Sequence, residues 1–474
     1  MLTQKKNRVL KKEYLVFKIK NIQNANLRYI LPYKLFFLFS TLFINNLYSQ
    51  GQFALSGAGS ATGIVSSESE VPFWFYTNTS MRIGEFTNAA VYGNVNSEFS
   101  WGNNNIFGTG VSLMLRDGVE EEFQRENLFI EYKNNWLKAS LGAKEREIYY
   151  NGLSATNGNM IWSVNARPMA GLILEANQPL RISNSFFLDW GIAHYSLNDD
   201  RYVTDTRVHY KRLGLIVKIN DKHQIRGQLQ HFAQWAGTSP DFGELPNDFE
   251  AFVDVFFARS GGEEAPPGEE QNSVGNHLGS YLLKYDLKTS IGDFSAYHEH
   301  PFEDGSGTGF KNFPDGVWAM TFSPSNKKII SHFLYEYMNT MKQSGTQDIS
   351  GRDNYFNNTI YQSGWTYEGN IIGTPLYISD KSDNLPVISN RVKSHHFGIM
   401  GTLKKIDWVF KTTYSTSYGT YQYPFDTVQE NWYNYVSFSY STKKFGVISM
   451  HGGADTSNIE DTILGGGLSY KYLF

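Results

Sequence analysis

The chain has no cysteine among its 474 residues, and beyond its first fifty residues it has no long apolar run. The absence of cysteine excludes a disulfide framework, a thiolate metal site and a cysteine nucleophile. After residue 50 no uninterrupted apolar stretch is long enough to form a membrane-spanning helix. The mean hydropathy of the chain is -0.39. Charged residues make up only 19% of the chain while aromatic residues make up 16%, which argues against intrinsic disorder.

The first fifty residues have the organisation of an export signal. Nine Lys and Arg residues and a single acidic residue lie within residues 1–34, and a mostly apolar run follows at residues 35–44. This order predicts a secretory signal peptide over residues 1–50, cleaved near Ser49 or Gln50. A signal anchor is the alternative, although the apolar run is about half of the ~20 residues that cross a bilayer.

Alternation of apolar and polar residues recurs along residues 51–474. Strands need this pattern when one face meets hydrocarbon and the other faces a wet lumen, and Tyr or Trp often flanks the apolar sets, as in interface girdles. The sequence therefore predicts an all-β fold, a single large antiparallel outer-membrane β-barrel of about 16–18 strands. The alternating segments are residues 111–116, 128–133, 137–144, 186–193, 281–288, 406–414 and 436–441.

A large soluble β-sandwich or propeller is the alternative, because its strands also alternate. The positions opposite the apolar sets are often Ser, Gly, Lys, Asp or Glu, as a polar lumen requires. The exported chain also shows no repeat of about 40 residues, which a propeller would need. Both observations favour the barrel.

The last strand of this pattern runs up to an aromatic residue at Phe474. Such a strand resembles the sorting signal of Gram-negative outer-membrane barrels. It implies recognition by the barrel-assembly machinery through the strand that ends in Phe474. The expected location is therefore integral to the outer membrane of a Gram-negative bacterium, with outer-membrane lipid as a partner.

The connections between predicted strands differ in length. Turn-forming residues at 133–135 and 220–222 predict short periplasmic turns. Much longer irregular stretches run over residues 235–276, 300–315 and 339–391. In outer-membrane barrels the long loops face the outside.

The first long stretch contains a pattern of helical rather than strand period. Asn247 is the expected N-cap, with Glu250 three residues later, and residues 260–262 are the expected stop. The pattern predicts an amphipathic helix of about three turns. Its apolar stripe must be covered, so we expect the helix to pack over or into the barrel and, with residues 339–391, to occlude the lumen. The stripe consists of Phe249, Phe252, Val253, Phe256 and Phe257.

Several short segments of the sequence, here called phrases, resemble the capsule assembly protein Wzi family, in its longer-loop branch. The resemblance covers most of residues 51–474 and depends on the order and density of the phrases, because none is a chemical signature by itself. They are found at residues 165–171, 255–262, 275–279, 300–307, 335–340, 343–345, 353–358 and 363–367.

This resemblance implies an outer-membrane barrel of about eighteen strands that is occluded rather than open. It further implies binding of capsular polysaccharide and its anchoring or assembly at the cell surface, in the manner of a lectin. No residue of a binding site carries over from the family.

The residues themselves are compatible with a sugar-binding surface over residues 335–367. Aromatic faces stack on the C–H surfaces of sugars, and amide and carboxylate groups bind hydroxyls. The alternative is that the aromatic residues are girdle residues and the Asn and Asp residues are turn formers. The predicted polysaccharide-binding residues are Glu336, Asn339, Asp353, Tyr355, Asn357, Asn358, Trp365, Tyr367 and Arg391.

Metal binding and catalysis are not expected. His298 and His300 would share one face of a strand, but two ligands do not make a zinc site, and no cofactor is implied. An outer-membrane lipid or glycan hydrolase would need a Ser–His pair, and no G-x-S-x-G elbow is present, the nearest phrase being the unspecific Ser394-His395-His396. A substrate-specific porin with an open lumen remains the main alternative function.

The charge of the chain bears on its partner. Residues 51–474 contain 33 Lys and Arg and 45 Asp and Glu, a net charge of -12. Such a surface does not attract anionic capsule in general, and it excludes nucleic acid, which needs a basic face. Recognition must then use local basic groups such as Arg391 and Lys393, neutral hydrogen bonds or bridging cations.

Overall fold

The computed structural model describes residues 51–260, 273–345, 352–380, 386–442 and 444–474. The predicted signal peptide over residues 1–50 lies outside these residues. The chain divides into two compact units, and the described residues of the first are 51–53 and 99–103. Residues 54–98 and 104–474 form the second unit.

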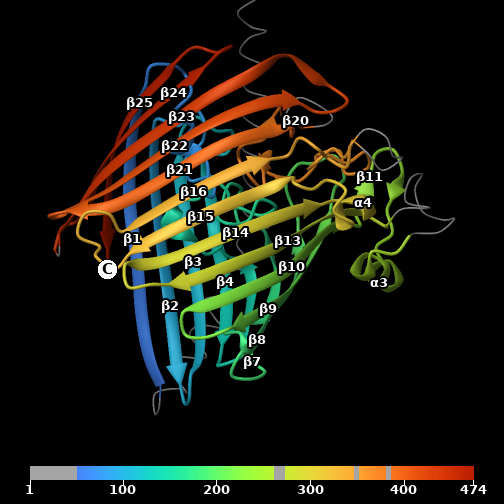
Figure 1. The fold of residues 1–474 in the computed structure, drawn as a ribbon, viewed down its shortest axis with the longest axis horizontal. Coiled ribbons are helices and arrows are strands. Elements are labelled where there is room, and N and C mark those ends of the chain that lie inside the picture. The colour runs from blue at the N-terminus through green and yellow to red at the C-terminus, as the bar shows by residue number, and fades with distance from the viewer. Residues whose placement is uncertain (1–50, 261–272, 346–351, 381–385, 443) are drawn as a thin grey trace, which may run out of the picture. The chain divides into compact units, whose positions relative to one another are not determined.

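The strands form one antiparallel barrel of eighteen strands (Figure 1). Nineteen strand segments are described, but β6 and β7 both pair with β8 and therefore make one interrupted strand. The segments are β1 (Gly51–Ser66), β2 (Ala89–Trp101), β3 (Asn105–Arg116), β4 (Phe123–Lys133), β5 (Leu137–Ala143), β6 (Ala170–Ala176), β7 (Leu180–Arg181), β8 (Phe186–Ser196), β9 (Arg207–Lys218), β10 (His223–Trp235), β13 (Asn276–Lys288), β14 (Gly292–Phe302), β15 (Gly316–Pro324), β16 (His332–Asn339), β21 (Val392–Leu403), β22 (Ile406–Gly419), β23 (Pro424–Thr442), β24 (Gly446–Ser457) and β25 (Ile463–Leu473).

Short elements occupy the connections. They are the strand pairs β11 (Thr238–Ser239) with β12 (Gly243–Glu244), β17 (Thr366–Tyr367) with β18 (Asn370–Ile371) and β19 (Ile378–Ser379) with β20 (Val387–Ser389), and the helices α2 (Phe73–Tyr76), η1 (Tyr150–Gly152), α3 (Phe249–Phe257) and α4 (Gly305–Thr308). None of the helices in the described residues is long and apolar enough to cross a membrane.

The barrel closes between its last and first strands. β25 pairs with β1 in a register that sets Ala58 opposite Leu473 and Ser66 opposite Gly465. Every other barrel strand pairs with the next one along the chain. Closure satisfies the backbone groups that an open sheet edge would leave unpaired, which a strand protein needs in lipid.

Alternation along the strands sorts side chains to the two faces of the barrel, as predicted. In β3, Leu113 and Leu115 are 42% and 49% exposed, whereas the neighbouring Ser112, Met114 and Arg116 are at most 2% exposed. The exposed side chains are apolar because this outward face is the one that suits lipid. The inward side chains are either polar or packed against the connections that fill the lumen, which are described below.

The connections separate by length between the two ends of the barrel. The predicted turns at 133–135 and 220–222 are short, and they lie at the same end as the end of β25. The long connections between β10 and β13, between β14 and β15 and between β16 and β21 follow strands that run the other way, so they gather at the opposite end, here called the long-loop end. The predicted long stretches are confirmed as connections.

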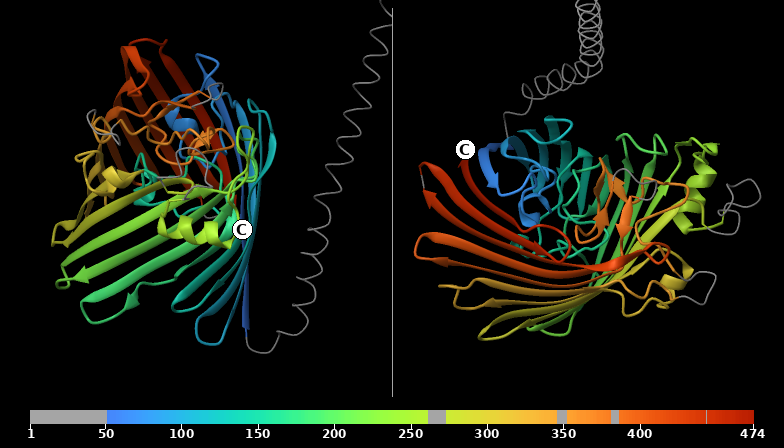
Figure 2. Two further views of the ribbon diagram at one scale, coloured as in Figure 1. Left: turned by 90° about the vertical axis from the view of Figure 1, so that its right-hand side faces the viewer. Right: turned by 90° about the horizontal axis from the view of Figure 1, so that it is seen from above.

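The lumen is filled by the described residues of three connections, here called the plug: 67–88, 144–169, and 340–345, 352–380 and 386–391 of the third. In both views of Figure 2 they lie within the ring of strands. One buried cluster joins Phe73 and Trp74 to Met160, Ile161 and Trp365, and inward side chains of the strands complete it. The predicted occlusion by residues 339–391 is therefore correct.

Inward carboxylates hold the plug by its main chain. Glu336 of β16 accepts from the Ala155 N–H at 2.7 Å, Glu299 of β14 from the Met160 N–H at 2.7 Å, and Asp455 of β24 from the Phe73 N–H at 2.6 Å. The plug segments lack strand partners for these N–H groups, so each carboxylate satisfies a donor that burial would otherwise leave unpaired.

The prediction that helix α3 occludes the lumen is wrong. The helix forms where expected, with Asp248 rather than Asn247 as N-cap, its Oδ1 accepting from Ala251 N–H at 2.8 Å. However, its apolar side packs on Ala233, Trp235, Ala236 and Val274. Phe252 packs against His194 and His209. His209 shares the outward face of its strand with the exposed Leu213 and Leu215, and His194 shares that of its strand with the exposed Phe186.

The outer wall at this level carries imidazole and indole groups instead of aliphatic side chains, and α3 covers them. Phe256 also lies against His209, at 5.2 Å between ring centroids. Phe249 and Phe257, at the two ends of the helix, remain 79% and 61% exposed. The predicted apolar stripe is thus only partly buried, and on the outside of the barrel.

Candidate functional site

The predicted polysaccharide-binding residues are mostly part of the plug interior. Trp365, Tyr355 and Tyr367 are at most 1% exposed, and Glu336 and Asn357 are 2% and 7% exposed. Burial of this degree leaves no ring face open for stacking on a sugar. For these five residues the structure places the side chain away from any ligand at the surface.

The buried aromatic residues use their polar atoms to hold the plug together. Trp365 donates its Nε1–H to the Ile161 carbonyl at 2.6 Å, and the Tyr367 hydroxyl donates to Asn198 Oδ1 at 2.7 Å. The Tyr355 hydroxyl donates to Asp315 Oδ2 at 3.2 Å. A buried Trp or Tyr normally finds such a partner, so these rings are structural.

The other predicted residues are half-buried. Asn358 Oδ1 accepts from the N–H groups of Ile360 and Tyr361, which is the turn-forming role. Asp353 accepts from Ser344 Oγ at 2.7 Å, and the Arg391 guanidinium lies 4.1 Å from the centroid of the Tyr421 ring. The predicted sugar-binding role of Asn339, Asp353, Asn358 and Arg391 stays a prediction.

The rings of His298, His300 and His396 all contact neighbouring groups of the protein. His298 stacks on Trp318 at 3.7 Å and His300 Nδ1 lies 3.2 Å from the Asp315 carbonyl. Within the described residues, no group of three or more His, Asp or Glu side chains is placed to hold a metal ion. His396 is occupied at both ring nitrogens, by Thr413 Oγ1 and by the Leu153 carbonyl, so it is not available as a base for Ser394.

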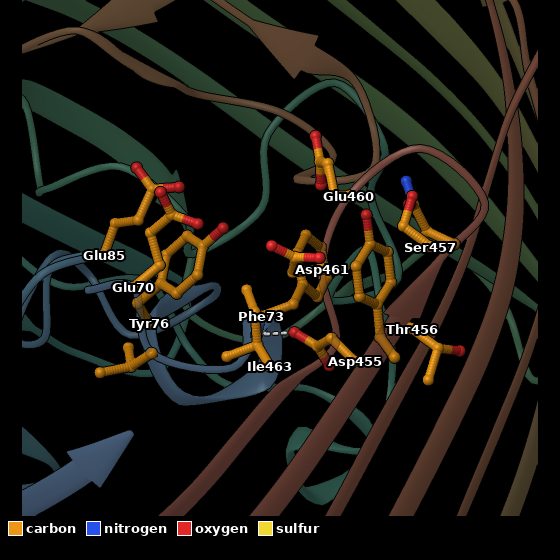
Figure 3. Close-up of a pocket in the computed structure, with 13 residues that line it drawn as sticks. Glu70, Phe73, Tyr76, Glu85, Asp455, Thr456, Ser457, Glu460, Asp461 and Ile463 are labelled. Atoms are coloured by element: carbon orange, nitrogen blue, oxygen red, sulfur yellow. Dashed lines mark hydrogen bonds between the residues drawn. The ribbon is translucent and has the colours of Figure 1, made fainter. Parts of the chain in front are cut away.

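A cleft at the long-loop end, here called the rim cleft, combines aromatic and acidic side chains (Figure 3). It lies between the β1–β2 connection, the ends of β23 and β24 and the β24–β25 connection. Its lining residues are Glu70, Val71, Phe73, Tyr76, Glu85, Asn431, Tyr433, Asp455, Thr456, Ser457, Glu460, Asp461 and Ile463.

Aromatic stacking fixes the floor of the rim cleft. The ring of Phe73 stacks on that of Tyr433, with 4.1 Å between centroids and 15° between planes. Asp455, 7% exposed, accepts from the Phe73 N–H through Oδ2. Burial, and then the charge of Glu85, raises the pKa of Tyr76 well above its ordinary value, so that its phenol is neutral at physiological pH.

Two inward glycines make room for the segment that builds this floor. A Cβ at Gly465 would lie 2.4 Å from Pro72 Cδ, and a Cβ at Gly453 would lie 2.7 Å from Pro72 Cβ. Only glycine allows so close an approach of residues 67–88 to β24 and β25. These glycines were the only local signal of the rim cleft, since its lining residues come from distant parts of the sequence and share no motif.

Structural comparison finds barrels of the same fold. Wzi of Escherichia coli, described as an outer membrane protein involved in group 1 capsule assembly and as a carbohydrate-binding β-barrel, is 12% identical; the match covers 87% of this chain and 83% of that one, with a TM-score of 0.58. OccK9 (OpdG) of Pseudomonas aeruginosa is 10% identical, with 89% of this chain and 98% of that one covered and a TM-score of 0.50.

Sequence comparison gives one assignment. No curated protein sequence matches the chain. The family model described as capsule assembly protein Wzi matches residues 72–378, which include one of the three plug segments entirely and most of the other two. The matched region covers more than half of the chain and agrees with the phrases found in the sequence. This chain belongs to the capsule assembly protein Wzi family.

Proposed function

We propose that this protein binds capsular or other extracellular polysaccharide at the long-loop end of the barrel and helps to anchor or assemble capsule at the cell surface. Family membership supports the proposal, together with the description of the structurally similar Escherichia coli Wzi as a carbohydrate-binding barrel. The observation that carries it is the rim cleft, in which ring faces and carboxylates line an accessible depression beside a filled lumen.

The surface of the barrel supports a location in the outer membrane. Outward leucine, valine and aromatic side chains are exposed on strands all round the ring. This face is the one proposed to meet outer-membrane lipid. Strand β25 is the segment proposed to be recognised by the barrel-assembly machinery.

Gene deletion tests the anchoring role. In a capsulated host that carries this gene, clean deletion is expected to release capsule into the medium while total polysaccharide synthesis is unchanged. Supplying the chain from a plasmid should return polysaccharide to the cell surface. If the deleted strain keeps its capsule on the cells, the proposed function is contradicted.

Binding by the purified protein separates the proposal from its alternatives. The barrel in detergent micelles should retain extracted capsule on a surface or a glycan array without changing its chain length. Progressive shortening of the glycan, abolished by a single Ser or His substitution, would instead identify a hydrolase.

A further inference from the structure

Helix α3 has a flank of apolar side chains that the barrel does not cover. Its buried face, with Ala251 and Val255, packs on the outer wall. The flank next to that face consists of residues spaced four apart in the sequence, which lie above one another along a helix. Two of them, Phe249 and Phe257, remain largely exposed. The members of this apolar flank are Phe249, Val253 and Phe257.

The contacts of α3 show which way the apolar flank faces. On the side of the flank, the Lys211 ammonium donates to the Phe256 carbonyl and lies 4.4 Å from the centroid of the Phe256 ring. On the other side, Val255 belongs to one cluster with Ala236 and Val274. Lys211 lies within β9, whereas Ala236 and Val274 lie beyond the long-loop ends of β10 and β13. The apolar flank therefore faces down the outer wall, toward the end that carries the short turns.

The outward residues of β9 and of the turn after it set the height of α3 on the barrel. The outward positions that follow Lys211 are Leu213, Leu215, Val217 and Ile219. Leu213 and Ile219 are 55% and 58% exposed. The eight residue steps from Lys211 to Ile219 cover about 27 Å along a strand and, at the usual tilt, about 20 Å across the membrane. Because the apolar band of an outer-membrane barrel is about 25 Å tall, α3 lies at the edge of this band on the long-loop side.

The charged groups of α3 lie where water and lipid headgroups meet. At 3.6 residues per turn, the positions that follow the apolar flank round the helix are Glu250 and Asp254. A helix with one apolar and one charged side is suited to the plane of a membrane interface. The Arg259 guanidinium, 60% exposed, lies 5.0 Å from the centroid of the Phe257 ring, and its ion pair with Asp254 is long at 3.9 Å. This cation beside the flank complements the anionic phosphate groups of outer-leaflet lipid.

We propose that α3 lies in the outer-leaflet interface of the outer membrane and inserts its apolar flank among the acyl chains of the outer-leaflet lipid. The flank continues the apolar surface of Leu213 and Leu215, so the hydrocarbon that covers those leucines also reaches Phe249 and Phe257. This continuity favours lipid over a second copy of the chain as the occupant. The inference goes beyond the proposed function, because it gives the connection after β10 a membrane-binding role.

The absence of cysteine allows single spin labels to test the inference. Phe249→Cys and Phe257→Cys variants of the full-length chain, each labelled with a nitroxide, report the surroundings of the apolar flank by electron paramagnetic resonance. Glu250→Cys is the matched control, because it is exposed on the same helix but lies outside the flank. Leu213→Cys gives a hydrocarbon reference, and the exposed Glu120→Cys gives a water reference.

The labelled barrel is reconstituted into bilayers that contain lipopolysaccharide. Labels on the apolar flank should collide several-fold more often with oxygen, which dissolves in hydrocarbon, than with a water-soluble nickel complex, as the label at Leu213 does. The label at Glu250 should show the reverse preference, as the label at Glu120 does. All five labels replace exposed side chains, so the buried contacts of α3 are kept, and heat-modifiable migration on gels checks that each variant is folded.

Three results would overturn the inference. A preference of the flank labels for the nickel complex would place α3 in water above the membrane. Shielding of these labels from both reagents would show that a second copy or another protein covers the flank. If the label at Leu213 also prefers the nickel complex, the outward face does not meet lipid, and the proposed location in the outer membrane fails with the inference.

Discussion

At the scale of single residues, the inward carboxylate of Glu336 holds a plug segment to the barrel wall. It accepts from the Ser154 hydroxyl at 2.5 Å, the Ala155 N–H at 2.7 Å and the Tyr297 hydroxyl at 2.6 Å, and it is 2% exposed. The sequence interpretation gave this residue a role in sugar binding. Its position among buried donors makes it structural.

Replacing Glu336 with Ala is expected to lower the free energy of unfolding by about 3 kcal/mol, because it leaves buried donors without an acceptor. Glu336→Gln keeps one carbonyl oxygen in place and should cost less. Urea unfolding of the folded barrel in detergent measures both, with the exposed Glu120→Gln as control. An unchanged midpoint for Glu336→Ala would contradict the role.

At the scale of elements, the connection over residues 303–315 docks on residues 340–345 through the buried Asp315, and the half-buried Asp353 joins two parts of the second connection. Asp315 accepts from the N–H groups of Lys342 and Gln343, and Asp353 accepts from Ser344. Burial raises the pKa of Asp315 to about 6 and that of Asp353 to about 7, both above the ordinary value. The nearby charge of Asp304 raises the pKa of Asp353 further.

An acid whose pKa is raised on folding stabilises the docked state when it is protonated, and this contribution is lost as pH rises through the folded pKa. The docking should therefore weaken between about pH 5 and about pH 8. Hydrogen exchange at the amides of Lys342 and Gln343, corrected for intrinsic rates, should show greater protection at the lower pH. Asp315→Asn should flatten this dependence, and a dependence that survives the substitution would contradict it.

Helix α3 allows a second prediction at this scale. Val255 is fully buried against the outer wall, whereas Phe249 on the same helix is 79% exposed. Val255→Asp should detach the helix, since it would bury an unpaired charge, and residues 236–260 should then be cut rapidly by protease. Phe249→Asp should leave the cleavage rate near that of the unaltered chain. Equal resistance of the two variants would show that the helix is not held by this contact.

At the scale of the whole molecule, the filled lumen predicts a barrel that does not conduct. Buried side chains of the plug, such as Trp365 and Met160, fill the lumen, and both of these are 0% exposed. Purified protein in planar bilayers should therefore show negligible conductance. Trp365→Ala leaves a large cavity and should cost about 3–5 kcal/mol, with brief openings as the plug loosens. Porin-sized steps from the unaltered chain would favour the porin alternative.

The sequence by itself determined the positions of the strands and the side of each strand that faces lipid. It also determined that short connections gather at one end of the barrel and long connections at the other. These features depend on local chemistry: a period of two sorts residues such as Leu113 and Ser112 to opposite faces, and turn residues limit the length of a connection. The order of the phrases was also enough to identify the family.

Only the tertiary structure decided what lies inside the barrel and what lies outside. The apolar side of α3 could have packed on either the inner or the outer face of the barrel. It packs on the outer face because the imidazole and indole groups there provide its contacts. Trp365 and Tyr355 have the side chains of a sugar site, but burial made them plug residues. The rim cleft brings Tyr76 together with Asp455, and no local pattern encodes a contact between residues so far apart along the chain.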